Sequence, residues 1–161
     1  MQFRPGTPAG AAGRSRKIAA MSRWVCPFCD REFGAEHQAH TCVPGCSVED
    51  TFARSPPGQR QAYDTIIAHL ESLGPVHEDA VQVGVFLKRQ RKFAEIRPMA
   101  RALSLDLVLP RVVTDSRVVR RLRISGDRVV HIVRLTGRND VDDQIREWLT
   151  EAFLAAGTEG G

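Results

Sequence analysis

The chain has 161 residues, of which 42% are apolar, and it carries 23 Lys or Arg against 19 Asp or Glu, a net charge of +4. This length suits one domain with an appendage. The apolar residues form no run of membrane length, which excludes an integral membrane protein, so we expect a soluble cytoplasmic chain without a membrane partner.

Residues 1–21 have the composition of a disordered N-terminal extension. They contain basic residues, several Gly, Pro and Ala, and no acid, so they cannot bury a core. No apolar segment follows the basic residues, and we therefore expect no signal peptide. Because Met21 is a natural start, we interpret the preceding residues as an upstream extension of the reading frame; an Arg-rich transit peptide is the alternative.

A Cys-Pro-Phe-Cys motif, followed by His-Thr-Cys, has the spacing of a closed zinc site. A Cys-x-x-Cys turn places two sulfurs on one side of a knuckle, and a later His or Cys pair completes a tetrahedron with no open position for water. We therefore predict a structural Zn²⁺ in a small knuckle over residues 22–46. The favoured ligands are Cys26, Cys29, His40 and Cys42.

The residues alone leave alternatives to this ligand set open. We expect a short helix over residues 35–39 that carries His37 and His40 on one face, so His37 could replace Cys42. Cys46 is a spare thiol that could also compete. A redox dithiol is less favoured because no apolar strand precedes Cys26, and a disulfide would need an oxidising compartment.

Residues 47–156 predict an α+β domain that begins with two helices. Ser47 and Asp50 resemble a capping box, which opens a short helix through Ala53. A longer helix is expected to begin with Ser55 as its cap and proline in its first turn, and to end at Gly74. Its apolar side chains recur at helical spacing: Tyr63, Ile66, Ile67, Leu70 and Leu73.

Five strands and a last helix are expected in the rest of this domain. The strands cover residues 81–88, 92–97, 103–109, 118–124 and 129–135, and their short links imply an antiparallel meander. Asn139 or Asp140 is expected to cap the last helix, whose broad apolar face includes Trp148 and Phe153. We therefore predict an α+β fold, with a sheet of about five strands packed by two main helices and a disordered tail at 157–161.

Several of these motifs occur together in one known family. They are the segments 24–29 (Trp-Val-Cys-Pro-x-Cys), 38–42 (Gln-x-His-x-Cys), 48–52 (Val-Glu-Asp-x-Phe), 56–57 (Pro-Pro) and 140–143 (Asp-Val-Asp-Asp). In this order they resemble uncharacterised bacterial proteins of the DUF 5655 type. The resemblance implies a bacterial cytoplasmic protein with a zinc knuckle fused to a small α+β domain, and no known activity. Asn is common in that family where this chain has His37, which favours Cys42 as the ligand.

The positive charge is concentrated between Lys88 and Arg138, where fourteen Lys or Arg face four acids. Such a region suits an anionic partner, and phosphate contacts give sequence-independent affinity, so we favour a binding module for nucleic acid or another polyanion. The ordinary alternative is a solvated sheet face, because alternation sends Arg121 and Arg123 to one face and Arg120 to the other. A scaffold that binds a protein partner also stays open.

The second hypothesis is an enzyme or a small-anion binder that uses the open face of the sheet. The candidate anion-binding residues are Lys88, Arg97, Arg121, Arg123 and His131. His131 could be a general base, but it shares its strand face with apolar residues and is more typical of a core histidine. The sequence contains no recognisable nucleophile pair and no phosphate-binding Gly loop, so we do not favour an enzyme.

Overall fold

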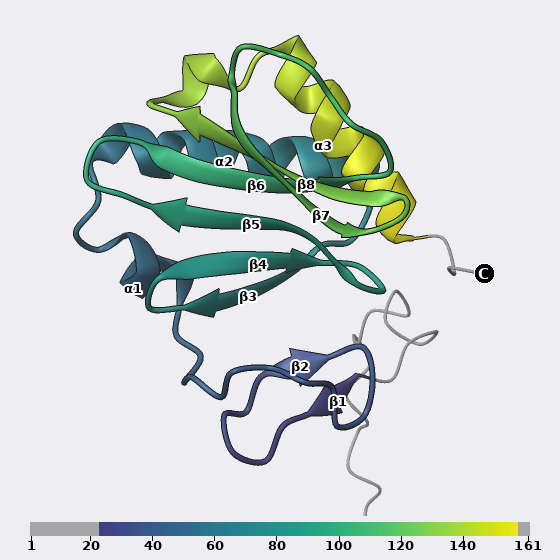
Figure 1. Cartoon of the computed structure of the whole chain (residues 1–161). Coiled ribbons are helices and arrows are strands. Elements are labelled where there is room, and N and C mark those ends of the chain that lie inside the picture. The colour runs from purple at the N-terminus through teal and green to yellow at the C-terminus, as the bar shows by residue number, and fades with distance from the viewer. Residues whose placement is uncertain (1–22, 158–161) are drawn as a thin grey trace, which may run out of the picture.

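The computed structural model describes residues 23–157. The extension predicted at residues 1–21 lies outside this range, and so do residues 158–161 of the predicted tail. Figure 1 shows a small N-terminal lobe, the knuckle, which lies next to the edge strand β3 (His77–Val81) of a larger sheet. The helices labelled α2 (Pro57–Leu73) and α3 (Asp143–Ala156) cover the face of that sheet which is turned away from the viewer. None of the helices in the described range is long and apolar enough to cross a membrane.

The elements form two sheets and three α-helices within the described residues. A two-stranded sheet in the knuckle is made of β1 (Trp24–Val25) and β2 (Glu32–Phe33). The helices are α1 (Val48–Phe52), α2 (Pro57–Leu73) and α3 (Asp143–Ala156). The main sheet contains β3 (His77–Val81), β4 (Gly84–Lys88), β5 (Lys92–Pro98), β6 (Leu103–Leu109), β7 (Val118–Ser125) and β8 (Arg128–Leu135).

The predicted α+β fold is confirmed, but the main sheet has six strands rather than five. The single strand predicted at residues 81–88 spans the last residue of β3, a two-residue turn and all of β4, and Val81 pairs with Gly84 across this turn. Valine recurs at alternate positions through this turn, so the turn looked like part of a strand. Val83 at the tip of the turn is 66% exposed. The two turn residues are not of the types that favour a hairpin turn; only the residue after them is a glycine.

The order of the strands also differs from the predicted meander. It is β3-β4-β5-β6-β8-β7, so β8 lies beside β6 and β7 forms the outer edge. All these neighbours are antiparallel. The link over residues 110–117 is long enough to pass beyond the position of β8, which a short turn could not do.

The capping box of α1 and the predicted end of α2 at Gly74 are confirmed, whereas the predicted N-caps of α2 and α3 are shifted. The Ser47 hydroxyl accepts from the Asp50 N–H, and the Asp50 carboxylate accepts from the Ser47 N–H. Helix α2 is capped by Pro56 rather than Ser55, whose hydroxyl instead donates to the Phe52 carbonyl. Gly74 ends this helix with a φ of 158°, a conformation that favours glycine.

The N-cap of α3 is Asp142, whose carboxylate accepts from the Ile145 N–H at 3.0 Å. The predicted caps Asn139 and Asp140 belong to a 3₁₀ turn at Arg138–Asp140 that precedes the helix. Asp140 accepts instead from the Thr136 N–H, which closes the turn after β8. The predicted helix at residues 35–39 is replaced by an irregular turn.

The core fills the space between the main sheet and the helices α2 and α3. Every strand of the main sheet except β7 contributes buried side chains to it, such as Leu105, and the helices add others, such as Leu70 and Leu149; β7 contributes only the partly buried Val118. His131 belongs to this core: it is fully buried, its Nε2 accepts from the Val113 N–H at 2.9 Å, and its Nδ1 donates to the Val129 carbonyl. Burial lowers the pKa of His131, which keeps the imidazole neutral at neutral pH.

Candidate metal centre

The knuckle brings its first two cysteines together through a tight turn between β1 and β2. The two strands pair antiparallel, with Trp24 opposite Phe33. Within the turn, the Cys26 N–H donates to the Arg31 carbonyl at 3.0 Å and the Asp30 N–H donates to the Cys26 carbonyl at 2.8 Å. Asp30 has a φ of 56°, the left-handed conformation that a non-glycine residue adopts mainly in tight turns. This turn places both sulfurs on the same side of the knuckle.

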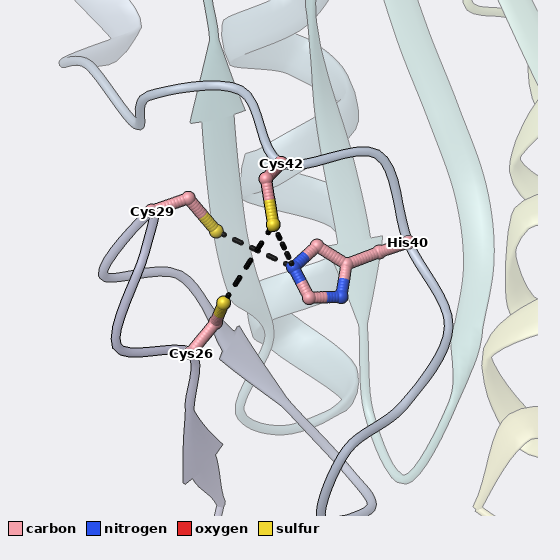
Figure 2. Close-up of side chains that lie close together, drawn as sticks. All are labelled: Cys26, Cys29, His40 and Cys42. Atoms are coloured by element: carbon pink, nitrogen blue, oxygen red, sulfur yellow. Dashed lines mark hydrogen bonds between the residues drawn. The ribbon is translucent and has the colours of Figure 1, made fainter.

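His40 and Cys42 complete a compact group of four donor atoms (Figure 2). The four atoms lie within 4.8 Å of one another. The sulfurs of Cys26 and Cys42 are 3.8 Å apart, and His40 Nε2 lies 3.4 Å from the Cys29 sulfur and 3.3 Å from that of Cys42. Zinc bonds of about 2.3 Å to sulfur and about 2.0 Å to nitrogen place tetrahedral ligand atoms roughly 3.5 to 3.8 Å apart. The donor set and its spacing therefore fit a Cys₃His zinc site.

The ring of His40 is held in the orientation that a metal ligand needs. Its Nδ1 donates to the Gln38 carbonyl at 2.6 Å, which leaves the lone pair of Nε2 facing the three sulfurs. Phe33 stacks on the ring, with centroids 3.9 Å apart. Phe33, Cys26 and Cys29 are buried together, with Trp24 packed against them. A small apolar core thus shields the group on one side.

His37 and Cys46, the two alternative ligands, lie outside this group. His37 is 81% exposed, and its ring packs 5.3 Å from that of Trp24. The Cys46 sulfur lies 3.5 Å from the Thr51 hydroxyl and packs against the main core. The turn that replaces the predicted helix at residues 35–39 explains the position of His37, because it removes the common face with His40.

The pKa values of the Cys26 and Cys42 thiols shift in opposite directions. Burial alone would raise the pKa of Cys26, but N–H groups of Phe28 and Cys29 and the neighbouring thiols outweigh it and lower this pKa to about 6. Burial, together with the hydrogen bond and charge of Cys26, raises the pKa of Cys42 to about 11. A bound cation would favour the thiolate form at all three positions.

One family model matches the chain, over residues 48–156, and its description is "Domain of unknown function (DUF5655)". The chain belongs to the DUF5655 family. The match begins at the first residue of α1, so the knuckle of this DUF5655 protein precedes it and the family assigns neither a metal nor an activity. No curated protein and no solved structure matches the chain significantly.

In this DUF5655 protein a buried group of charges joins the knuckle to the main sheet. Asp79 on β3 accepts from Arg31 Nε and Nη2 at 3.1 and 3.0 Å, and from Lys88 Nζ at 2.6 Å. All three side chains are buried. The two cations also hold the knuckle backbone, since Arg31 donates to the Thr41 carbonyl and Lys88 to that of Glu32. This group was not predicted from the sequence, because Asp79 precedes the strand predicted at residues 81–88 and its partner Arg31 is 48 positions away.

Two of the predicted anion-binding residues have acidic partners on the sheet face away from α2 and α3. Lys88 forms an ion pair with Asp79, where the knuckle packs on the sheet. Arg97 is 44% exposed and pairs with Asp106 at 3.2 Å and with Glu95 at 3.3 Å. His131 lies on the opposite face, in the core. The DUF5655 sheet therefore does not bring these three residues together at one site.

The other two predicted anion-binding residues, Arg121 and Arg123, lie on the edge strand β7. Arg121 Nε donates to the Val113 carbonyl at 2.7 Å, and Arg123 Nη1 donates to the Gly126 carbonyl at 2.6 Å. Both side chains stay exposed. Since β5, β6 and β8 separate β4 from β7, these arginines are remote from Lys88.

Proposed function

We propose that this protein is a zinc-stabilised binding module that holds an anionic macromolecule through the arginines of β7. The zinc has a structural role in this proposal, because four protein ligands leave no coordination position for a substrate or a water molecule. The observation that carries the proposal is the charge of β7, which presents Arg120, Arg121 and Arg123 to solvent and contains no acid.

The pairing of charges elsewhere in the basic region supports β7 as its binding surface. Several other cations between Lys88 and Arg138 have acidic partners: Lys88 with Asp79, Lys92 with Glu95, Arg97 with Asp106, and Arg117 with Asp142. Among the described residues the three arginines of β7 form no ion pair; Arg101 and Arg138 form none either, but they lie singly in turns, whereas β7 brings three such arginines together on one strand. Each guanidinium has five N–H donors, so a single bond to a backbone carbonyl leaves most of them free for a partner.

A small-anion site or an active site on the open sheet face has weaker support. The two cations predicted for that face, Lys88 and Arg97, form ion pairs with acids. Both ring nitrogens of His131 form hydrogen bonds with backbone groups in the core. A general base needs to reach the proton that it removes, and His131 is fully buried.

A mixed-sequence oligonucleotide is the first probe of this proposal, because it is a polyanion whose regularly spaced phosphates test for charge-driven binding. We expect binding that weakens with salt, with a slope of log affinity against log salt between about −2 and −3 if three phosphates are contacted. Replacing the three arginines of β7 with glutamine should weaken binding and flatten this slope.

The matched control replaces three exposed arginines outside the main sheet, Arg54, Arg101 and Arg138, with glutamine and so removes the same charge. The measurement is repeated on a chain that begins at Met21, because the basic residues before it could bind by themselves. Equal losses in the two triple variants would show that net charge, not β7, is responsible, and the proposal would be wrong.

A further inference from the structure

We infer that the outer edge of β7 receives an acidic, extended peptide, which adds to the main sheet as a seventh strand. This inference rests on the proposed function and names the kind of partner that its surface fits. Strand addition uses the unpaired N–H and C=O groups of a sheet edge for affinity and the alternate side chains for specificity.

The two edges of the main sheet differ in how far the chain itself covers them. At β3, Gly45 pairs with Val81, and the Cys46 N–H donates to the Ala80 carbonyl at 3.0 Å. The residues that leave the knuckle thus occupy part of this edge. At the opposite edge, β7 pairs only with β8 among the described strands, and all its residues after Val118 are exposed. A strand of eight residues therefore presents a free outer edge.

The side chains of β7 suit a peptide better than they suit a nucleic acid. Val119, Leu122 and Ile124 are 58%, 43% and 52% exposed, and they are interleaved with the arginines. A phosphate backbone uses only the cations, and single strands add stacking on aromatic rings, which β7 lacks. A strand in which acids alternate with apolar residues can use both the arginines and the aliphatic side chains.

The charge of β7 also argues against a second copy of this chain as the partner. Two β7 edges joined about a two-fold axis would bring two sets of three arginines together without an acid between them. Like charges on adjacent strands are destabilising, whereas opposite charges stabilise the pair. An acidic strand is therefore the complementary partner.

Two bulges define the part of β7 where the pairing should be centred. The register with β8 shifts between Val118 and Arg120 and again between Arg123 and Ser125. Between these bulges the strand is regular from Arg120 to Arg123. Bulges and charged side chains hinder unspecific edge-to-edge association, so a neutral strand should bind poorly at this segment.

The test uses the full-length, zinc-loaded protein and an end-blocked fluorescent peptide of alternating glutamate and valine that matches the eight residues of β7. Fluorescence anisotropy measures its affinity, and hydrogen exchange measures the protection of the β7 amides. Two control peptides replace glutamate with lysine or carry N-methyl groups that remove the backbone donors. The double variant Arg120→Glu/Arg123→Glu is compared with Arg54→Glu/Arg101→Glu, which changes the charge equally.

The acidic peptide should bind, protect the β7 amides, and lose about tenfold or more in affinity in the β7 variant but not in the control variant. The lysine and N-methyl peptides should bind poorly. If the N-methyl peptide binds as well as the parent, strand addition is wrong. If the oligonucleotide binds through β7 and the peptide does not, the proposed function stands and this inference fails. If neither probe binds, both fail.

Discussion

Replacing Asp79 with asparagine tests whether the buried charges stabilise the junction between the knuckle and the sheet. The substitution keeps the size of the side chain but removes its charge. Arg31 and Lys88 would then remain buried, at 7% and 6% exposure, without their shared carboxylate. Removing one partner from a buried ion pair typically costs about 3–5 kcal/mol, and here one carboxylate serves two cations. We expect a loss of unfolding free energy in that range.

Chemical denaturation in the presence of a fixed zinc concentration measures this loss. The matched control is Asp64→Asn, which removes a carboxylate that is 57% exposed and pairs with Arg60 on the surface of α2. An exposed pair of this kind contributes less than about 1 kcal/mol, so the control should change the stability little. Similar small losses for both variants would refute the stabilising role that we assign to the buried group.

A second comparison separates unpaired charge from lost packing. The triple variant Arg31→Met/Asp79→Leu/Lys88→Met replaces all three charges with apolar side chains. Because burying charges is itself unfavourable, apolar replacement of a whole buried ion pair is often neutral. The triple variant should therefore be more stable than Asp79→Asn. If it is less stable, the charges themselves contribute more than their burial costs.

The remaining predictions concern the metal, acid and the independence of the domain. Metal analysis after dialysis should find about one zinc per chain, and His40→Ala should lose it whereas His37→Ala should retain it. Burial alone would raise the pKa of Asp79, but the hydrogen bonds and charges of Arg31 and Lys88 outweigh it and lower this pKa. The stability that Asp79 contributes should thus be complete above its unfolded pKa of about 3.9 and decline as the pH falls through the lower folded value; parallel denaturation curves of the protein and Asp79→Asn check this. A chain that begins at Ser47 should fold but unfold at a lower denaturant concentration, because it exposes the Asp79 and Lys88 pair; an unchanged midpoint would contradict this.

The features that the sequence predicted well depend on residues close together in the chain. The capping box at Ser47 spans four residues, and its two hydrogen bonds form as expected. The four favoured ligands lie within residues 26–42, so their spacing alone restricts which donors can meet. The apolar stripe of α2 was likewise visible as a helical period, although Leu73 at its end is 38% exposed.

The features that the sequence did not predict depend on contacts between distant residues. Arg31 and Asp79 are 48 positions apart, and no local pattern distinguishes their ion pair from two solvated charges. The position of β8 beside β6 depends on how the link over residues 110–117 crosses the end of the sheet. The hairpin at Val81 was hidden because its turn lacks turn-forming residues at its centre. In each case packing between elements determined the outcome.

The pairing of Gly45 with Val81 has a consequence for how this protein can assemble. A molecule with two uncovered sheet edges can join a neighbour on each side, and such head-to-tail growth leads to fibres. Here the residues that leave the knuckle cover part of the β3 edge, at Val81 and Ala80, so β7 is the less covered of the two edges. We expect this cover to hinder head-to-tail growth of the sheet from one molecule to the next.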